Sequence, residues 1–228
     1  MKSIRSAFSI IEVLVVIAII ATLMAVSVTY LSSAKARAKG IECQKNLGDW
    51  TKALGMYIDE SRVHAFPQIG KGQPGESNAW YNVLARHLDT RPLSDYAEGE
   101  TPPAPKSGIK SMYVCPLASK GKGIFCYAAN GYFAKDANPD GKALRAANVR
   151  DASSFVAFLD SPDASRCSAT PGQVLAPSSD SFRHGSRVNI AFFDGSVRSL
   201  QPRQISAGSD NPKTINEHNV YWDAFPED

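Results

Sequence analysis

Four cysteines are the residues of this 228-residue chain whose chemistry is simplest to name: Cys43, Cys115, Cys126 and Cys167. Outside the cytoplasm, four cysteines suit two disulfides, for which three pairings exist. We expect Cys43 to pair with Cys115, and Cys126 to pair with Cys167. Unpaired, buried thiols are the alternative. No Cys-x2-Cys pair occurs, so we expect no zinc site.

His184 is followed ten positions later by Asp194 and Gly195, a pair that invites a catalytic interpretation. A hydrolase needs a nucleophile, a base and an orienting group, but the chain has no Gly-x-Ser-x-Gly elbow. It also has no P-loop and no dinucleotide fingerprint. We therefore expect no enzyme and no catalytic residue. A secreted hydrolase remains an alternative, and it would need a cleft that contains His184 and a nucleophile.

The stretch between His184 and Asp194 alternates apolar residues as a strand does, which places its two ends about 20 Å apart or more. The two side chains should therefore not touch. We expect His184 to bond nearby backbone or loop groups and Asp194 to serve a turn. Calcium is the one cation that the sequence leaves open, because Asp160 and Asp194 are carboxylates predicted at strand ends. Solvated turn residues are the simpler interpretation, and we expect no other cofactor.

The elements that must position these residues lie in residues 63–228, which contain all fourteen prolines. We predict an α+β head with a small antiparallel sheet, a short helix over 79–88, and loops over 97–110 and 162–181. The predicted strands are 111–115, 124–128, 155–159, 187–193 and 196–200. Asp194-Gly195 predicts a type I′ hairpin that places Phe192 opposite Val197.

Residues 32–60 lack proline and repeat apolar positions at steps of three and four, which predicts an amphipathic helix. Its apolar stripe should face the sheet and consists of Cys43, Leu47, Trp50, Leu54, Tyr57 and Ile58.

Before this helix, the sequence has no charged residue from Val13 to Ala34. A helix over residues 8–31 would be roughly 36 Å long, enough to cross a hydrocarbon core of about 30 Å. Lys2 and Arg5 precede it, which favours a cytoplasmic N-terminus with the rest outside. A secretory signal cleaved near Ala34-Lys35-Ala36 and a plain membrane anchor are two alternatives. Neither explains Glu12, because a carboxylate in an apolar span is costly and usually marks function.

The run Ala7-Phe8-Ser9-Ile10-Ile11-Glu12 resembles the type IV prepilin signal of pilins and type II secretion pseudopilins. That family usually has Gly before Phe-Thr-Leu-Ile-Glu, so Ala7 is a departure. The resemblance implies that a prepilin peptidase cuts after Ala7 and methylates the Phe8 amine. Glu12 then takes the fifth mature position. There it would pair with the amine of a neighbouring subunit, because a buried charge is tolerated only when paired.

The rest of the chain resembles prepilin-processing-associated proteins, whose signature is His-x9-Asp-Gly, here His184 with Asp194-Gly195. Such proteins also carry an early cysteine, a Cys-Pro and a Tyr-x-x-Asn, matched here by Cys43, Cys115-Pro116 and Tyr127-Ala128-Ala129-Asn130. The resemblance implies a pilin-like fold in which a long helix packs on the head. The implied domains are a leader over 1–7, a transmembrane and spine helix over 8–62, and a head over 63–228.

By this resemblance the chain is a structural, pseudopilin-like subunit of a type II secretion or type IV pilus-like filament. Its partners would be a prepilin peptidase, other pilin-like subunits and the bacterial inner membrane, with the head outside the cytoplasm. A net charge of +3 with no run of basic residues argues against nucleic acid as a binding partner. The alternative function is a membrane-anchored extracytoplasmic binding module, for example for glycan, that uses exposed tryptophans and long loops.

Overall fold

The computed structural model describes residues 9–62, 64–104, 111–118, 123–133, 144–162, 166–176, 179–206 and 215–224, without the side chains of 28 and 29. The predicted processing residues Ala7 and Phe8 lie outside these ranges. The chain forms two compact units, Met1–Lys39 and Gly40–Asp228.

The first helix, α1, runs from Ile10 to Glu60, close to the predicted range of 8–62. The boundary between the two units falls inside this helix, so residues 40–60 belong with the head. The other helices and strands of the described residues are α2 (Trp80–Val83), β1 (Tyr127–Asn130), β2 (Val156–Asp160), β3 (Ser168–Ala169), α3 (Pro171–Val174), β4 (Val188–Phe192), β5 (Val197–Leu200) and α4 (Pro202–Ser206). Short 3-10 turns lie at 84–87, 93–95, 131–133 and 146–148.

The five strands form one sheet in the order β3-β1-β2-β4-β5. Three neighbouring pairs are antiparallel, but β1 and β3 run parallel. The α+β class is therefore confirmed, whereas the prediction of a purely antiparallel sheet is wrong. The error comes from β3, which has only two residues and lies inside the predicted loop 162–181. Thr170 and Gln173 form a capping box at the start of α3 in the same segment, a signature that the sequence does contain.

The predicted strand over 111–115 is also wrong. Backbone hydrogen bonds from Val114 to Ser111 and from Ala118 to Cys115 fold this segment into successive turns. Only Tyr113 and Cys115 of this segment are buried, and neither belongs to a strand. Tyr113, for example, is 3% exposed and donates its hydroxyl to the carbonyl of Tyr81.

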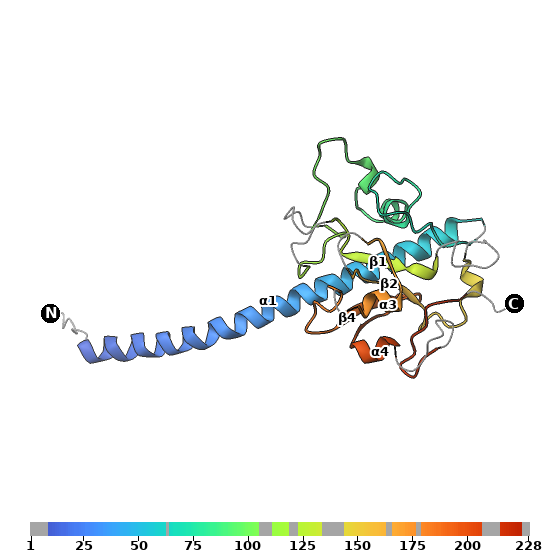
Figure 1. The fold of residues 1–228 in the computed structure, drawn as a ribbon. Coiled ribbons are helices and arrows are strands. Elements are labelled where there is room, and N and C mark those ends of the chain that lie inside the picture. Colours follow the sequence, from blue (N-terminus) through green and yellow to red (C-terminus); the bar gives the residue numbers. More distant parts are fainter. Residues whose placement is uncertain are drawn as a thin grey trace, which may run out of the picture. The chain divides into compact units, whose positions relative to one another are not determined.

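Both faces of the sheet are covered. On one face, residues 40–60 of α1 pack with α2 against Tyr127 and Phe158 and against small residues of three strands: Ala129, Ala157 and Ala191. On the other face, α3 and α4 contribute to a second apolar cluster with Val188, Ile190 and Phe192 of β4. Figure 1 shows the cyan end of α1 along the labelled strands, with α4 on the opposite side of the sheet. The larger side chains of β4 thus face away from α1, and alanines let the helix approach the sheet.

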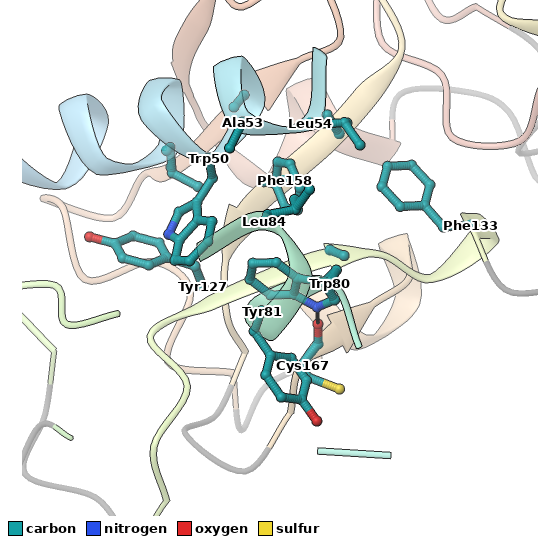
Figure 2. Packing of buried hydrophobic residues seen from close by; sticks show 14 of the residues in the cluster. Trp50, Ala53, Leu54, Trp80, Tyr81, Leu84, Tyr127, Phe133, Phe158 and Cys167 are labelled. Carbon is teal, nitrogen blue, oxygen red and sulfur yellow. Dashed lines mark hydrogen bonds between the residues drawn. The ribbon is translucent and has the colours of Figure 1, made fainter. Parts of the chain in front are cut away.

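The predicted stripe of α1 is buried as expected, apart from the half-buried Tyr57. Trp50 lies at its centre, and its ring meets that of Trp80 edge-on with 5.2 Å between centroids. Both indole N–H groups are satisfied, since Trp50 donates to the carbonyl of Met112 and Trp80 to that of Cys167. Figure 2 shows Trp50, Ala53 and Leu54 of the helix pointing into this aromatic cluster.

The hairpin between β4 and β5 differs from the predicted type I′ turn. Only Gly195 has a positive φ, of 89°, and its N–H bonds the carbonyl of Phe192. This is the pattern of a three-residue loop, a type I turn followed by a left-handed glycine. The extra residue shifts the register, so that Ala191, and not Phe192, lies opposite Val197.

The disulfide between Cys43 and Cys115 is present and joins α1 to the 111–118 turns across 72 residues of chain. By the chain-entropy argument, a loop of this length stabilises the fold by about 4 kcal/mol.

We expect the double variant Cys43→Ala/Cys115→Ala to lose about 4 kcal/mol of its free energy of unfolding, because the unfolded chain is no longer cross-linked. Urea titration in detergent micelles, followed by near-ultraviolet circular dichroism of the buried tryptophans, measures it. Adding reductant should lower the stability of the parent chain and leave that of the variant unchanged. Equal stability of parent and variant would contradict the structural role.

Candidate functional site

The N-terminal half of α1 is apolar on every side. Between Ile10 and Leu31, the large apolar side chains that the structure describes are 45% to 79% exposed. By length and composition this helix can cross a membrane. A helix that is apolar all round is normally buried in a core or in a bilayer. Within the described residues of this chain, nothing covers it.

Glu12 lies in the first turn of α1, and one of its carboxylate oxygens accepts a 2.8 Å hydrogen bond from the Ser9 N–H. The Ser9 hydroxyl in turn accepts from the Ile11 N–H. Together these two bonds cap the helix, because they satisfy N–H groups that have no partner inside it. Capping explains the presence of Glu12 at this position even in a plain membrane anchor. The sequence signal was the Ser-x-x-Glu spacing itself.

The second candidate site lies in the head, where a disulfide meets buried charges. Cys43 comes from α1, Cys115 from the 111–118 turns, and Asp160 from the last position of β2. Arg183 and His184 come from the segment that leads into β4. We call these five residues the disulfide–histidine cluster. The side chain of Asp160 is fully buried, and those of Arg183 and His184 are each 6% exposed.

His184 is the centre of this cluster. Its Nε2 lies 3.2 Å from Oδ2 of Asp160 and 3.6 Å from Sγ of Cys115. Its Nδ1 faces Gly40 of α1, where an added Cβ would lie 3.7 Å away. The prediction that His184 bonds nearby backbone or loop groups holds for its N–H, which bonds Arg187, but not for its ring, whose partner is a buried carboxylate at the end of the neighbouring strand.

Gly185 and Ser186 direct His184 inward. Their φ values are 65° and 62°, and the His184 N–H bonds the carbonyl of Arg187. Two successive positive φ values are the mark of a type I′ turn. The turn type predicted for Asp194-Gly195 thus occurs at the other end of β4.

Arg183 neutralises the buried carboxylate. Its Nη2 lies 3.7 Å from Oδ1 of Asp160 and donates to the carbonyls of Cys126 and Ser161, while its Nη1 donates to Asp180. Burial alone would lower the pKa of Arg183, but the neighbouring charges, first that of Asp160, outweigh it and raise the pKa. The guanidinium therefore stays charged inside the head. Arg183 was not predicted as a site residue, and its only sequence signal was a positive charge shortly before the predicted strand over 187–193.

Some polar atoms in this region have no hydrogen-bond partner among the described residues. They are Oδ1 of Asp160, Nε of Arg183, Nδ1 of His184 and Nδ2 of Asn189. The N–H of Asn189 bonds Oδ2 of Asp160, and its side-chain oxygen accepts from Gln44 of α1. Native proteins satisfy nearly all buried polar groups, so such a concentration points to a site and not to ordinary core.

The disulfide–histidine cluster lacks the nucleophile of a hydrolase triad. Asp160 and His184 resemble an orienting acid and a base, but the other atom that Nε2 faces is a disulfide sulfur, which is no nucleophile. Asp194 takes no part, since its carboxylate accepts from the N–H and hydroxyl of Ser196 within its own turn. The strand register places Asp160 and Asp194 at opposite ends of the β2–β4 pair, so they do not form the calcium pair that the sequence left open.

Cys126 and Cys167 are both free and buried, so the second predicted disulfide is wrong. The parallel register pairs Ala129 with Ser168, which offsets the two cysteines by two residues. Two strand residues span roughly 7 Å, and the strand spacing adds to that, beyond the Cα separation that a disulfide allows. Burial raises the pKa of the Cys167 thiol to about 11 and also raises that of Cys126.

The Tyr-x-x-Asn residues of β1 serve packing. The Tyr127 hydroxyl accepts a hydrogen bond from Asn46 of α1. Asn130 is fully buried and donates to the carbonyls of Val156 and Trp222, which fastens the C-terminal segment to the sheet.

No family model, no curated protein and no solved structure matches this chain.

We expect Asp160→Asn to destabilise the head by about 3 kcal/mol or more, because it leaves Arg183 as a buried cation without its fully buried carboxylate. Asp180→Asn is the matched control, since Asp180 bonds the same guanidinium but is 37% exposed and should cost at most about 1 kcal/mol. Chemical denaturation compares the two. Equal losses would show that burial of Asp160 does not set the strength of this interaction.

We expect iodoacetamide to leave the native chain unlabelled at pH 8, because both free thiols are buried and their raised pKa values keep them protonated. In denaturant without reductant, Cys126 and Cys167 should react and the peptides of Cys43 and Cys115 should stay linked. Mass spectrometry of the digest reads both results. Labelling of all four cysteines without reductant would contradict the disulfide.

Proposed function

We propose that the chain is a pseudopilin-like structural subunit of a type II secretion or type IV pilus-like filament. A prepilin peptidase removes residues 1–7 and methylates Phe8. The apolar half of α1 then holds the subunit in the bacterial inner membrane as a single pass, with the head outside the cytoplasm. Other pilin-like subunits are its partners in the filament, and the chain itself catalyses no reaction.

The observation that carries this proposal is the exposure of the apolar helix on all its sides. An amphipathic helix needs one covering surface, but this one needs lipid or neighbouring helices all around. A membrane surrounds the helix with lipid, and a helical filament surrounds it with the helices of neighbouring subunits. A subunit that moves from one to the other needs this uniform apolar surface in both places.

Glu12 supports the filament over a plain anchor if its charge matters beyond capping. Cleavage after Ala7 would create an amine at Phe8, four residues before Glu12 in the sequence, and we propose that this amine pairs with the Glu12 carboxylate of a neighbouring subunit. Capping needs only a hydrogen-bond acceptor, which glutamine also offers. Pairing with an ammonium group in an apolar bundle needs the negative charge.

The arrangement of the head is consistent with the pilin-like fold implied by the sequence. Residues 40–60 of α1 pack against one face of a small sheet, and the disulfide fixes them there. The same polypeptide helix thus continues from the apolar segment into the core of the head.

The alternative of a membrane-anchored glycan-binding module loses its main support. All three tryptophans are buried, with Trp50, Trp80 and Trp222 at most 2% exposed. Sugar rings stack on exposed aromatic faces, and these indoles offer none.

We expect protein recovered from cells with an active prepilin peptidase to begin at methylated Phe8. The loss of Lys2 and Arg5 lowers the formal net charge from +3 to +1. Intact-mass analysis measures the change, and the same chain from peptidase-deficient cells is the control. A full-length chain in both strains would contradict the proposal, and a new N-terminus near Ala36 would indicate a secretory signal instead.

We expect Glu12→Gln to keep the capping hydrogen bond and membrane insertion but to lose filament incorporation, because the amide cannot neutralise a neighbour's amine. Glu12→Ala should lose both the cap and incorporation. Cell fractionation measures insertion, and cross-linking between subunits measures incorporation. Ser9→Ala is the matched control, since it weakens only the cap. Normal incorporation of Glu12→Gln would reduce Glu12 to a helix cap.

A further inference from the structure

The disulfide–histidine cluster has the donor atoms of a metal site. The two sulfurs of Cys43 and Cys115 and a ring nitrogen of His184 all lie within 4.8 Å of one another. The three residues come from a helix, a loop and a turn that lie far apart in the sequence, so no short cysteine motif indicated the site. Thiolate and imidazole are the ligands that zinc prefers in proteins.

We propose that the dithiol form of this chain binds one Zn²⁺ ion through Cys43, Cys115 and Nε2 of His184, with the Asp160 carboxylate at the fourth position. Zinc and the disulfide then use the same two sulfurs and exclude each other. The head has two closed forms, one fastened by a covalent bond and one by a metal ion.

The distances around His184 fit a tetrahedral zinc ion. With Zn–N and Zn–O bonds of about 2.0 Å and Zn–S bonds of about 2.3 Å, tetrahedral edges are roughly 3.3 Å for N–O and 3.5 Å for N–S. The contacts of Nε2 are 3.2 Å to Oδ2 of Asp160 and 3.6 Å to Sγ of Cys115. The S–S edge would be roughly 3.8 Å, so zinc can enter only after the 2.06 Å disulfide has opened.

The surroundings suit the charge of such a centre. Two thiolates, one carboxylate and Zn²⁺ sum to a single negative charge, which the buried Arg183 guanidinium balances beside Asp160. The Asn189 N–H bonds Oδ2 of Asp160 and so orients that oxygen, as outer-shell groups do in metal sites. Cys43 and Cys115 are at most 1% exposed, which matches a closed structural site.

Reduction followed by zinc binding converts the disulfide form into the zinc form. Opening the disulfide takes up two electrons and two protons and gives two thiols. A dithiol supplies both and becomes a disulfide, whereas a phosphine supplies the electrons, water supplies the protons, and the water oxygen ends in the phosphine oxide. Zinc binding then releases both protons as the thiols become thiolates. A newly made chain already carries thiols, so zinc can bind before a thiol–disulfide oxidoreductase withdraws the two electrons. In that order, zinc holds α1 on the head until the covalent bond closes.

The test uses the full-length chain in detergent micelles, reduced with a phosphine that has no thiol of its own. We expect the reduced chain to take up one Zn²⁺ per molecule in competition with a chromophoric chelator. Co²⁺ should give the near-ultraviolet charge-transfer band of a cobalt–thiolate bond. The oxidised chain should bind neither ion.

Variants separate this site from other thiols. His184→Ala should weaken zinc binding at least about 100-fold, since losing a ligand costs more than the 10–100-fold typical of outer-shell changes. Cys126→Ala/Cys167→Ala is the matched control, because it removes two buried thiols and should leave the affinity unchanged.

Near-ultraviolet circular dichroism covers the case in which the reduced head loosens. Zinc should then restore the signal of the buried tryptophans, because a structural metal contributes its binding energy to folding. No recovery, equal binding by the oxidised chain, or full affinity in His184→Ala would each overturn the proposal. None of these outcomes depends on filament assembly, so the site and the proposed function fail independently.

Discussion

One helix must satisfy two surroundings with opposite demands. The residues of α1 from Val13 to Leu31 are apolar on every side and need cover from outside the chain, while those after Gly40 form one wall of the core of the head. The second half can pack closely because the facing sheet offers Ala129, Ala157 and Ala191. Aromatic rings fill the remaining space, with Trp50 against Trp80 at its centre. The sheet, the covering turns and the disulfide all serve this contact.

Close packing of a helix on a sheet normally excludes charge, yet Asp160 lies fully buried beside it. A lone buried carboxylate would be strongly unfavourable, so the head supplies Arg183, His184 and a backbone N–H around it. Such an arrangement contributes little net stability over an apolar core of the same shape. Its retention is better explained by specificity, or by a ligand, than by stability.

The sequence predicted what depends on local pattern. The apolar run, the stripe from Cys43 to Ile58 and the strands of β2, β4 and β5 all follow from periodicity, and the first disulfide was correctly paired. Prediction from the sequence failed where one residue, or a partner far away in the chain, determines the local structure. One extra residue in the Asp194-Gly195 loop moved Val197 opposite Ala191. The two-residue strand β3 exists only because β1 offers an edge beside it, and no local pattern reports that.

The disulfide also changes how the subunit carries tension. A pull along α1 reaches Cys43 and crosses directly to Cys115, bypassing the residues between them, which span a sequence separation of 72. Those residues include the rest of α1, Trp50 and Trp80, so the aromatic core lies outside the load path. About 250 Å of contour length cannot be drawn out while the bond holds. Force passes instead into the chain that leads to β1, which is hydrogen-bonded between β3 and β2, so its pairing with both strands must shear before the head can yield.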